Sequence, residues 1–373
     1  MSVGSIALWG LVVGFIMTLV VITGFAYTTL LERIVLARLQ ARVGPNRAGY
    51  IPLPRGKDGR ERRLLGGIMQ PAADAVKMFF KEDPMPDKVD PVTYNLAPML
   101  TIIPAVVILA VIPWAGKISG LGDPRWEYFA IAPGINVGVV FILAITSIAV
   151  YGVTLAGWAS NSKYAILGGI RASAQMISYE LALGIIVLIP IMMTDAPNPM
   201  DLGAIVEAQR GLWFVVQQPI AALIFYIGVL AELQRAPFDL LEAEQELSAG
   251  YSVEYAGLRF GTFFVAEYMK MISLSAIAVV FFFGGYRGPF VDQVPVLGFV
   301  YMFGKIVISL FVMIWIRASL PRYRYDQLMS LGWKVLLPVA VLNFVVTAVA
   351  LVLAEEGVFA PIVTSLQQFL GGG

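Results

Sequence analysis

Long apolar runs alternate with shorter polar connections along the whole chain. Eight of the runs have the length and composition of membrane-spanning helices. Only helices suit them, because a backbone in lipid must satisfy its own hydrogen bonds. The pattern predicts an all-α integral membrane protein with a single membrane domain over residues 1–373. The eight predicted spans cover residues 5–30, 94–114, 133–158, 164–193, 212–233, 258–283, 296–317 and 331–354.

The connection over residues 32–93 is the longest, and its pattern predicts interfacial amphipathic helices. Arg38 and Arg42 lie one helical turn apart, which favours a short helix with its bases toward lipid headgroups. Residues 64–83 place Asp74 and Lys77 on one face and an apolar stripe on the other, which predicts a second amphipathic helix.

Composition and charge place this bundle in a membrane with a defined orientation. The chain is 58% hydrophobic and 14% charged, more apolar than a soluble domain can bury. The N-terminus lacks the basic start of a cleaved signal peptide, so the first run is predicted to be a retained span. Most Lys and Arg lie in the odd-numbered connections between spans, which predicts that these are cytoplasmic and that both termini lie outside.

Cysteine and histidine are both absent. The chain therefore has no thiolate metal site, no iron–sulfur cluster of its own and no histidine-ligated haem. It also lacks an imidazole to carry protons near neutral pH. Electron chemistry must come from a partner or a diffusible cofactor, and proton chemistry must depend on Glu, Asp, Lys, Tyr and water.

Residues 231–257 are the most acidic stretch of the chain, with Arg235 as the single base among six carboxylates. Acids this close repel one another and titrate as a coupled set, which suits proton handling. A plain solvated acidic loop is the alternative. The six carboxylates are Glu232, Asp239, Glu242, Glu244, Glu246 and Glu254.

A few ionisable residues fall inside the predicted spans, where each is expected to face the bundle or water. Glu180 has no base within one turn of its helix, so it is a candidate functional carboxylate. Glu267 and Lys270 lie one turn apart and could neutralise each other as a structural pair. Arg171 and Lys305 complete the set.

Several motifs together resemble the quinone-site membrane subunit, known as the H subunit, of type I NADH–quinone oxidoreductase (respiratory complex I). The likeness covers nearly the whole chain, and its strength lies in the number, order and placement of the motifs. The motifs are LLERIVLARLQARVGPNRAG at 30–49, QPAADAVKMFFKED at 70–83, GWASNSKYAILGGIRASAQMISYELALG at 157–184, the acidic stretch, AEYMK at 266–270 and RYDQL at 324–328.

The resemblance implies a subunit of a proton-translocating enzyme that carries no redox centre itself. Flavin and iron–sulfur clusters would lie on peripheral-arm partner subunits, quinone would be the substrate, and small and antiporter-like membrane subunits would be neighbours. A prokaryotic cell (inner) membrane is the implied location. The implied quinone-binding residues are Glu32, Arg33, Arg42, Arg47, Asp74, Lys77 and Arg324, and the implied proton path contains Glu180, Glu232, Glu242, Glu244, Glu246, Glu254 and Glu267.

The sequence departs from the family pattern at two places. Residues 50–63 form an insertion between the predicted interfacial helices, polar and basic enough to predict a mobile loop. Thr146-Ser147-Ile148 stands in the third span where some members carry an acid. The acidic line is therefore expected to be shorter or bridged by water at that point.

Two other functions remain open on the sequence. The chain could be the related membrane subunit of an energy-converting hydrogenase, or a stand-alone secondary transporter with Glu180, Glu267 and Lys270 in its pathway. The transporter fits less well, because no repeated halves are visible and the motifs of the connections would have no role.

Overall fold

A computed structural model describes residues 3–45, 51–52, 63–64, 67–117, 128–239 and 250–356. Its helices are α1 Val3–Leu39, α2 Gln70–Phe80, α3 Pro91–Val107, α4 Gly138–Ala159, α5 Lys163–Met192, α6 Leu202–Ala208, α7 Phe214–Gln217, α8 Pro219–Glu232, α10 Gly257–Phe282, α11 Leu297–Ser319, α12 Tyr325–Leu331 and α13 Leu337–Glu355. Short helical turns are η1 Ile108–Ala110, η2 Gly250–Ser252 and the π-helical η3 Gly332–Leu336. Strands β1 Ile51–Pro52 and β2 Arg63–Leu64 pair antiparallel, as do β3 Ala115–Gly116 and β4 Tyr128–Phe129.

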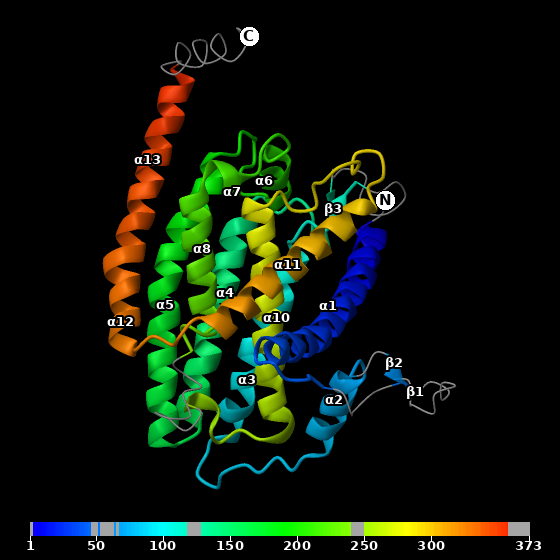
Figure 1. The fold of residues 1–373 in the computed structure, drawn as a ribbon, viewed down its shortest axis with the longest axis vertical. Coiled ribbons are helices and arrows are strands. Elements are labelled where there is room, and N and C mark those ends of the chain that lie inside the picture. The colour runs from blue at the N-terminus through cyan, green and yellow to red at the C-terminus, as the bar shows by residue number, and fades with distance from the viewer. Residues whose placement is uncertain are drawn as a thin grey trace.

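The helices form an upright bundle, which confirms the predicted class of all-α membrane protein (Figure 1). Within the described residues, seven helical stretches are long and apolar enough to cross a membrane. The start of α1 and the end of α13 lie on the same side of the bundle as α6 and α7, opposite to α2. This arrangement agrees with an even number of crossings.

The fifth predicted span, 212–233, is broken into α7 and the 14-residue α8. Pro219 begins α8, and the residue before a proline is driven out of helical geometry. Gln218 accordingly has φ −131° and ψ 63°. The prediction of eight spans rests on counting this shorter helix as one of them.

The separate interfacial helix predicted around Arg38 is wrong, because α1 continues without a break to Leu39. Residues 30–39 contain neither glycine nor proline, so nothing interrupts the helical hydrogen bonds there. Ala41, with φ 54°, then ends the helix. The second predicted amphipathic helix is present as α2, shorter than the predicted 64–83. Lys81 lies just beyond its end as the C-cap.

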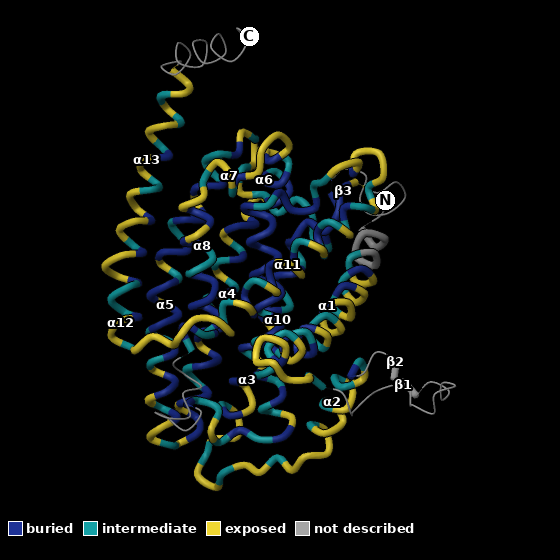
Figure 2. Tube along the Cα trace, viewed as in Figure 1, coloured by how far each residue is buried: buried dark blue, intermediate teal, exposed yellow. Residues whose placement is uncertain are grey.

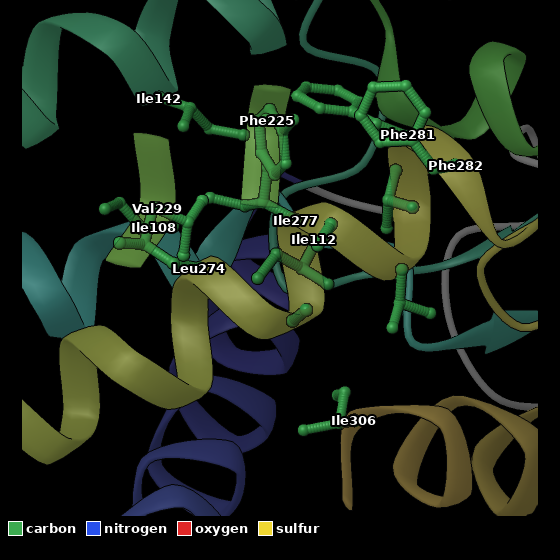
Figure 3. Packing of buried hydrophobic residues seen from close by; sticks show 14 of the residues in the cluster. Ile108, Ile112, Ile142, Phe225, Val229, Leu274, Ile277, Phe281, Phe282 and Ile306 are labelled. Atoms are coloured by element: carbon green, nitrogen blue, oxygen red, sulfur yellow. The ribbon is translucent and has the colours of Figure 1, made fainter. Parts of the chain in front are cut away.

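Burial is greatest at the centre of the bundle and least at its flanks (Figure 2). In the apolar windows of the spans, α10 has 78% of its residues buried, whereas α1 and the last helical stretch have 17% each. Figure 3 shows Phe225 and Val229 of α8 packed against Leu274, Ile277 and Phe281 of α10. The central helix α10 is therefore the one whose polar side chains are most completely removed from lipid.

Close helix contacts in this bundle depend on glycine. A Cβ added to Gly157 of α4 would lie 2.6 Å from the backbone oxygen of Ala165 and 3.0 Å from Cα of Gly169. Small residues let membrane helices approach at such distances. Gly184 of α5, in contrast, has nothing within 4 Å of an added Cβ.

We expect Gly157→Ala to lower the stability of the assembled protein by about 1–3 kcal/mol, the usual cost of overpacking. Gly184→Ala is the matched control, and there alanine's higher helix propensity gives no loss or a gain of up to about 1 kcal/mol. Thermal unfolding of the detergent-solubilised protein measures both. Equal melting temperatures for the two variants would contradict the close α4–α5 contact.

Candidate functional site

The candidate site begins at a cavity of about 510 Å³ between α1, α2 and α10. This volume lies in the range of small-molecule pockets. Most of its lining is apolar and includes Phe25, Met78 and Phe264. Arg33, Asp74 and Lys77 supply its charged groups.

Helix α2 brings two of these charged groups to the cavity wall. Pro71 in its first turn favours helix initiation, and no residue of α2 is buried. Arg33 of α1 pairs with Asp74 at 2.6 Å, which connects the two helices beside the cavity. The amphipathic pattern of α2 therefore presents both apolar side chains and charge to one space.

Tyr268 connects the cavity wall to a buried ionic cluster. Its ring packs against Phe264, with ring centroids 4.9 Å apart, and against Phe25 at 6.0 Å. Its hydroxyl donates to Glu32 Oε2 at 2.7 Å. A single phenol thus lies between the cavity lining and the first buried carboxylate.

Glu32 and Arg235 form the centre of this cluster. Glu32 is 3% exposed and Arg235 is 6% exposed, and Arg235 Nη1 lies 3.2 Å from Glu32 Oε1. Arg317 of α11 also pairs with Glu32, and Glu267 of α10 pairs with Arg235. Arg235 lies 4.5 Å from the Tyr268 ring centroid, within cation–π range.

Arg235 remains charged despite its burial. Burial alone lowers the pKa of its guanidinium, but Glu267, Tyr268 and Glu32 outweigh burial and raise the pKa above its usual range. Arg235 therefore acts as a permanent cation between two carboxylates.

Two further carboxylates continue from this cluster into the bundle. Lys270 donates to Glu232 Oε1 at 2.6 Å and to the Glu232 backbone oxygen at 3.0 Å. A cavity of about 40 Å³ is lined by Glu232, Glu267 and Lys270, and one of about 30 Å³ is lined by Glu232 and Glu180. Each is large enough for at least one water.

The third-span departure lies beside Glu180. The Ser147 hydroxyl donates to Glu180 Oε1, and Thr146 lines the same small cavity as Glu180 and Glu232. Hydroxyl groups therefore stand where some relatives were expected to carry an acid. The expectation that the acidic line is shorter or bridged by water at this point stays a prediction.

The structure brings together some of the sequence-predicted residues and separates others. The cavity is lined by Arg33, Asp74 and Lys77. Four carboxylates follow one another from there into the bundle, namely Glu32, Glu267, Glu232 and Glu180. Glu254 lies at the foot of α10, where its backbone oxygen accepts a hydrogen bond from Tyr94 at 2.7 Å. Arg47, Glu242, Glu244 and Glu246 lie outside the described residues.

Arg42 and Arg324 lie away from the cavity wall. Arg42 is exposed beyond the end of α1 and bonds to Gln40. Arg324 precedes α12, which Figure 1 places on the opposite flank of the bundle from α2. Its ion pair with Asp326 raises the pKa of Arg324 above its usual range.

Sequence reasoning missed the pairing that connects these groups. It treated Glu267 and Lys270 as a possible pair, whereas Lys270 bonds to Glu232 and Glu267 pairs with Arg235. It also gave no role to Tyr268 or Arg317. The sequence did single out Arg235, because it is the only base among the six acids of residues 231–257.

The structure is therefore that of a multi-pass helical membrane protein with a cavity in the size range of small-molecule pockets and with acids and bases paired inside its bundle. The profile of the NADH dehydrogenase family matches residues 12–348. The chain is 47% identical over 326 residues to the H subunit of NADH-quinone oxidoreductase from Protochlamydia amoebophila (strain UWE25), covering 87% of this chain and 92% of the relative. Identity to the H 1 subunit of the same enzyme from Geobacter metallireducens (strain ATCC 53774 / DSM 7210 / GS-15) is 46% over 334 residues, 90% and 94% of the two chains.

A third relative is the H subunit of NADH-quinone oxidoreductase from Rickettsia bellii (strain OSU 85-389), 45% identical over 345 residues, or 91% of this chain and 92% of that one. The chain belongs to the NADH dehydrogenase family, among the H subunits of NADH-quinone oxidoreductase. It is a multi-pass membrane subunit of a translocase and works with the other subunits of that complex. The relatives' names favour this reading over the hydrogenase subunit and the transporter.

We expect Lys270→Met to destabilise the protein by about 3–5 kcal/mol, because it leaves the buried Glu232 carboxylate without its cation. Adding Glu232→Gln removes that charge and should restore most of the loss. Adding Glu267→Gln instead should restore nothing, since Glu267 pairs with Arg235. Thermal unfolding of the three variants measures this, and rescue by Glu267→Gln would contradict the observed pairing.

Proposed function

We propose that this chain forms part of the quinone-reduction chamber of its complex and passes the charge displacement of quinone reduction into the membrane. The proposal is supported by a succession of polar groups, here called the row, that runs from the α1–α2–α10 cavity to Glu180. Direct contacts join its first members, which are Tyr268, Glu32, Arg235 and Glu267. Two small cavities then connect Glu267 to Glu232 and Glu232 to Glu180.

The cavity has the size and lining that a quinone needs. A quinone is an apolar ring with two oxygens, usually on an apolar tail, so it requires a mostly apolar pocket with a few polar groups. The cavity supplies aromatic and aliphatic walls together with Arg33, Asp74 and Lys77. These three are the residues that we assign to quinone binding, with Glu32 behind Tyr268 as the group that responds to it.

The chemistry divides between this chain and its partners. Reduction of a quinone to a quinol takes two electrons and two protons. Flavin and iron–sulfur clusters on peripheral-arm subunits would bring the electrons from NADH. The residues of this chain would bind the quinone and hold or move protons, in contact with small and antiporter-like membrane subunits.

The row of acids can respond to charge in the chamber. Two unit charges 4 Å apart interact by about 4 kcal/mol at an effective dielectric constant of 20, enough to displace a proton between neighbouring carboxylates. Glu232 is well placed for such a step. Its Oε1 is held by Lys270, whereas its buried Oε2 accepts no hydrogen bond from the described part of the chain. Glu232 also lines both small cavities, and a water in either could reach Oε2.

The acidic segment belongs to the same proposal. Glu242, Glu244, Glu246 and Glu254 would supply further coupled carboxylates on the cytoplasmic side, with both termini outside. Arg42, Arg47 and Arg324 would contribute at the surface that faces the peripheral arm.

We expect Asp74→Asn to raise the KM for quinone by roughly 1.5- to 5-fold, the range for losing a half-exposed ion pair of 0.2–1 kcal/mol. The turnover number should change less, because the row of acids is intact. Steady-state titration with a soluble quinone in membranes measures both constants. Asp87→Asn is the control, an exposed acid in the connection after α2. An unchanged KM in Asp74→Asn would argue against quinone binding in this cavity.

We expect Glu180→Gln to lower coupled quinone reductase activity roughly tenfold or more, because a proton-carrying group is removed from the end of the row. Glu355→Gln, at the exposed end of α13, is the control. NADH oxidation by quinone and the pH gradient formed across vesicles are measured together. Ferricyanide reduction by NADH checks that the peripheral arm is assembled. Full activity with a normal gradient in Glu180→Gln would refute the role of the row.

A further inference from the structure

The turn after α8 carries Arg235, the only cation that pairs with both Glu32 and Glu267 in the described structure. Its position therefore decides whether the cavity end and the inner end of the row are in contact. Arg235 is 6% exposed, so bulk solvent contributes little to holding this turn, and neighbouring protein groups contact it instead.

Helix α8 ends in a Schellman motif whose left-handed residue is not glycine. Gln234 has φ 55°, its N–H donates to the Ala231 oxygen at 3.2 Å, and the Arg235 N–H donates to the Leu230 oxygen at 3.3 Å. Glutamine lacks the freedom of glycine in this conformation. The turn therefore depends on outside contacts that favour it.

Gln175 of α5 supplies two of those contacts. It is 1% exposed, and its Nε2 donates to the backbone oxygens of Ala231 at 2.9 Å and of Phe238 at 3.0 Å. These two oxygens flank the segment that contains Gln234 and Arg235. One amide group thus holds both ends of the turn against α5.

The opposite side of the turn is held by the connection between α11 and α12. The Tyr323 N–H donates to the Pro237 oxygen at 3.0 Å, and the Tyr323 ring stacks on Phe238 with centroids 5.7 Å apart. Lys270 holds the last residue of α8 through the Glu232 oxygen. In the described structure, the uncharged Gln175 side chain donates to the backbone oxygens of Ala231 and Phe238 and is absent from the lining of the cavities described above.

We infer that Gln175 is a positioning residue for charge coupling: its two hydrogen bonds set the turn so that Arg235 lies between Glu32 and Glu267. The inference rests on the proposed function of the row. Helix α5 would then contribute to the row in two ways: through Glu180, which lies further along the helix, and through Gln175, which positions Arg235. Loss of the amide would let the turn shift and would weaken the contact between the two ends of the row.

Gln175→Met tests the inference because methionine keeps the volume and removes both hydrogen bonds. We expect a turnover number for quinone reduction roughly fivefold lower or more, with an unchanged KM for quinone, because the cavity is untouched. Ferricyanide reduction by NADH should remain normal. Gln175→Asn keeps an amide that is too short for both oxygens, so its activity should fall between that of Gln175→Met and the natural protein.

Gln209→Met is the matched control. Gln209 is also 1% exposed, and its Nε2 donates to the oxygens of Ile205 and Val280 near the opposite end of α10. Both methionine variants should lose thermal stability, but only Gln175→Met should lose turnover well below its melting temperature. Equal turnover in the two variants would show that Gln175 is merely structural.

A double-mutant cycle separates action through Arg235 from an independent effect. Arg235→Lys keeps the charge but cannot reach two carboxylates in the same way. If Gln175 acts through Arg235, adding Gln175→Met to Arg235→Lys should lower turnover little further. If the losses of turnover in the two single variants multiply in the double variant, the inference is overturned.

Glu267→Gln distinguishes failure of this inference from failure of the proposed function. If Glu267→Gln keeps full turnover and a normal pH gradient, the row itself has no role and both proposals fail. If Glu267→Gln is impaired while Gln175→Met is not, only the positioning role of Gln175 is refuted.

Discussion

The arrangement depends on the cost of keeping charge inside a helical bundle. Arg235 and Glu32 are nearly inaccessible to solvent, and an unpaired ion in that environment would cost several kcal/mol. Each is therefore paired more than once, Arg235 with Glu32 and Glu267, and Glu32 also with Arg317. These pairs connect α1, α10, α11 and the turn after α8. Satisfying the buried charge thus brings together helices that are far apart in sequence.

Under the proposed function, the same pairing would let a subunit without a redox centre take part in a redox enzyme. A group in the α1–α2–α10 cavity would lie within a few side chains of Glu32, through Tyr268. Beyond Glu32, carboxylates and bases alternate as far as the Lys270–Glu232 pair. In the proposed function, a change of charge at one end would alter the interaction in the next pair, and no electron would need to enter the chain.

The two departures from the family pattern occupy different parts of this arrangement. Ser147 and Thr146 lie at the inner end, where hydroxyl groups extend the polar lining around Glu180. Of the 50–63 insertion before α2, the structure describes residues 51, 52 and 63. The part predicted to be a mobile loop lies outside the described residues, and the structure pairs the segments on either side of it, with Ile51 opposite Leu64 and Pro52 opposite Arg63. Backbone pairing at the base of the insertion keeps its two ends together ahead of α2.

The sequence by itself determined the class of protein, most span boundaries and the identity of the acids, because long apolar runs and isolated charges within them are local properties. It also indicated the cavity charges Arg33, Asp74 and Lys77, through the resemblance to the quinone-site membrane subunit. It did not determine which charges pair. Glu267 and Lys270 are neighbours on one helix, yet each pairs with a residue at or beyond the end of α8.

Only the tertiary structure decided those partners, since they depend on how α8 ends and how α10 faces it. The partners of Gln175, Tyr268 and Arg317 could not be read from the sequence for the same reason, because the partner of an amide, phenol or guanidinium depends on the polar groups packed around it. Those groups come from distant segments. Periodicity along one helix reports which face is buried, whereas the partner on that face is known only when the helices are packed together.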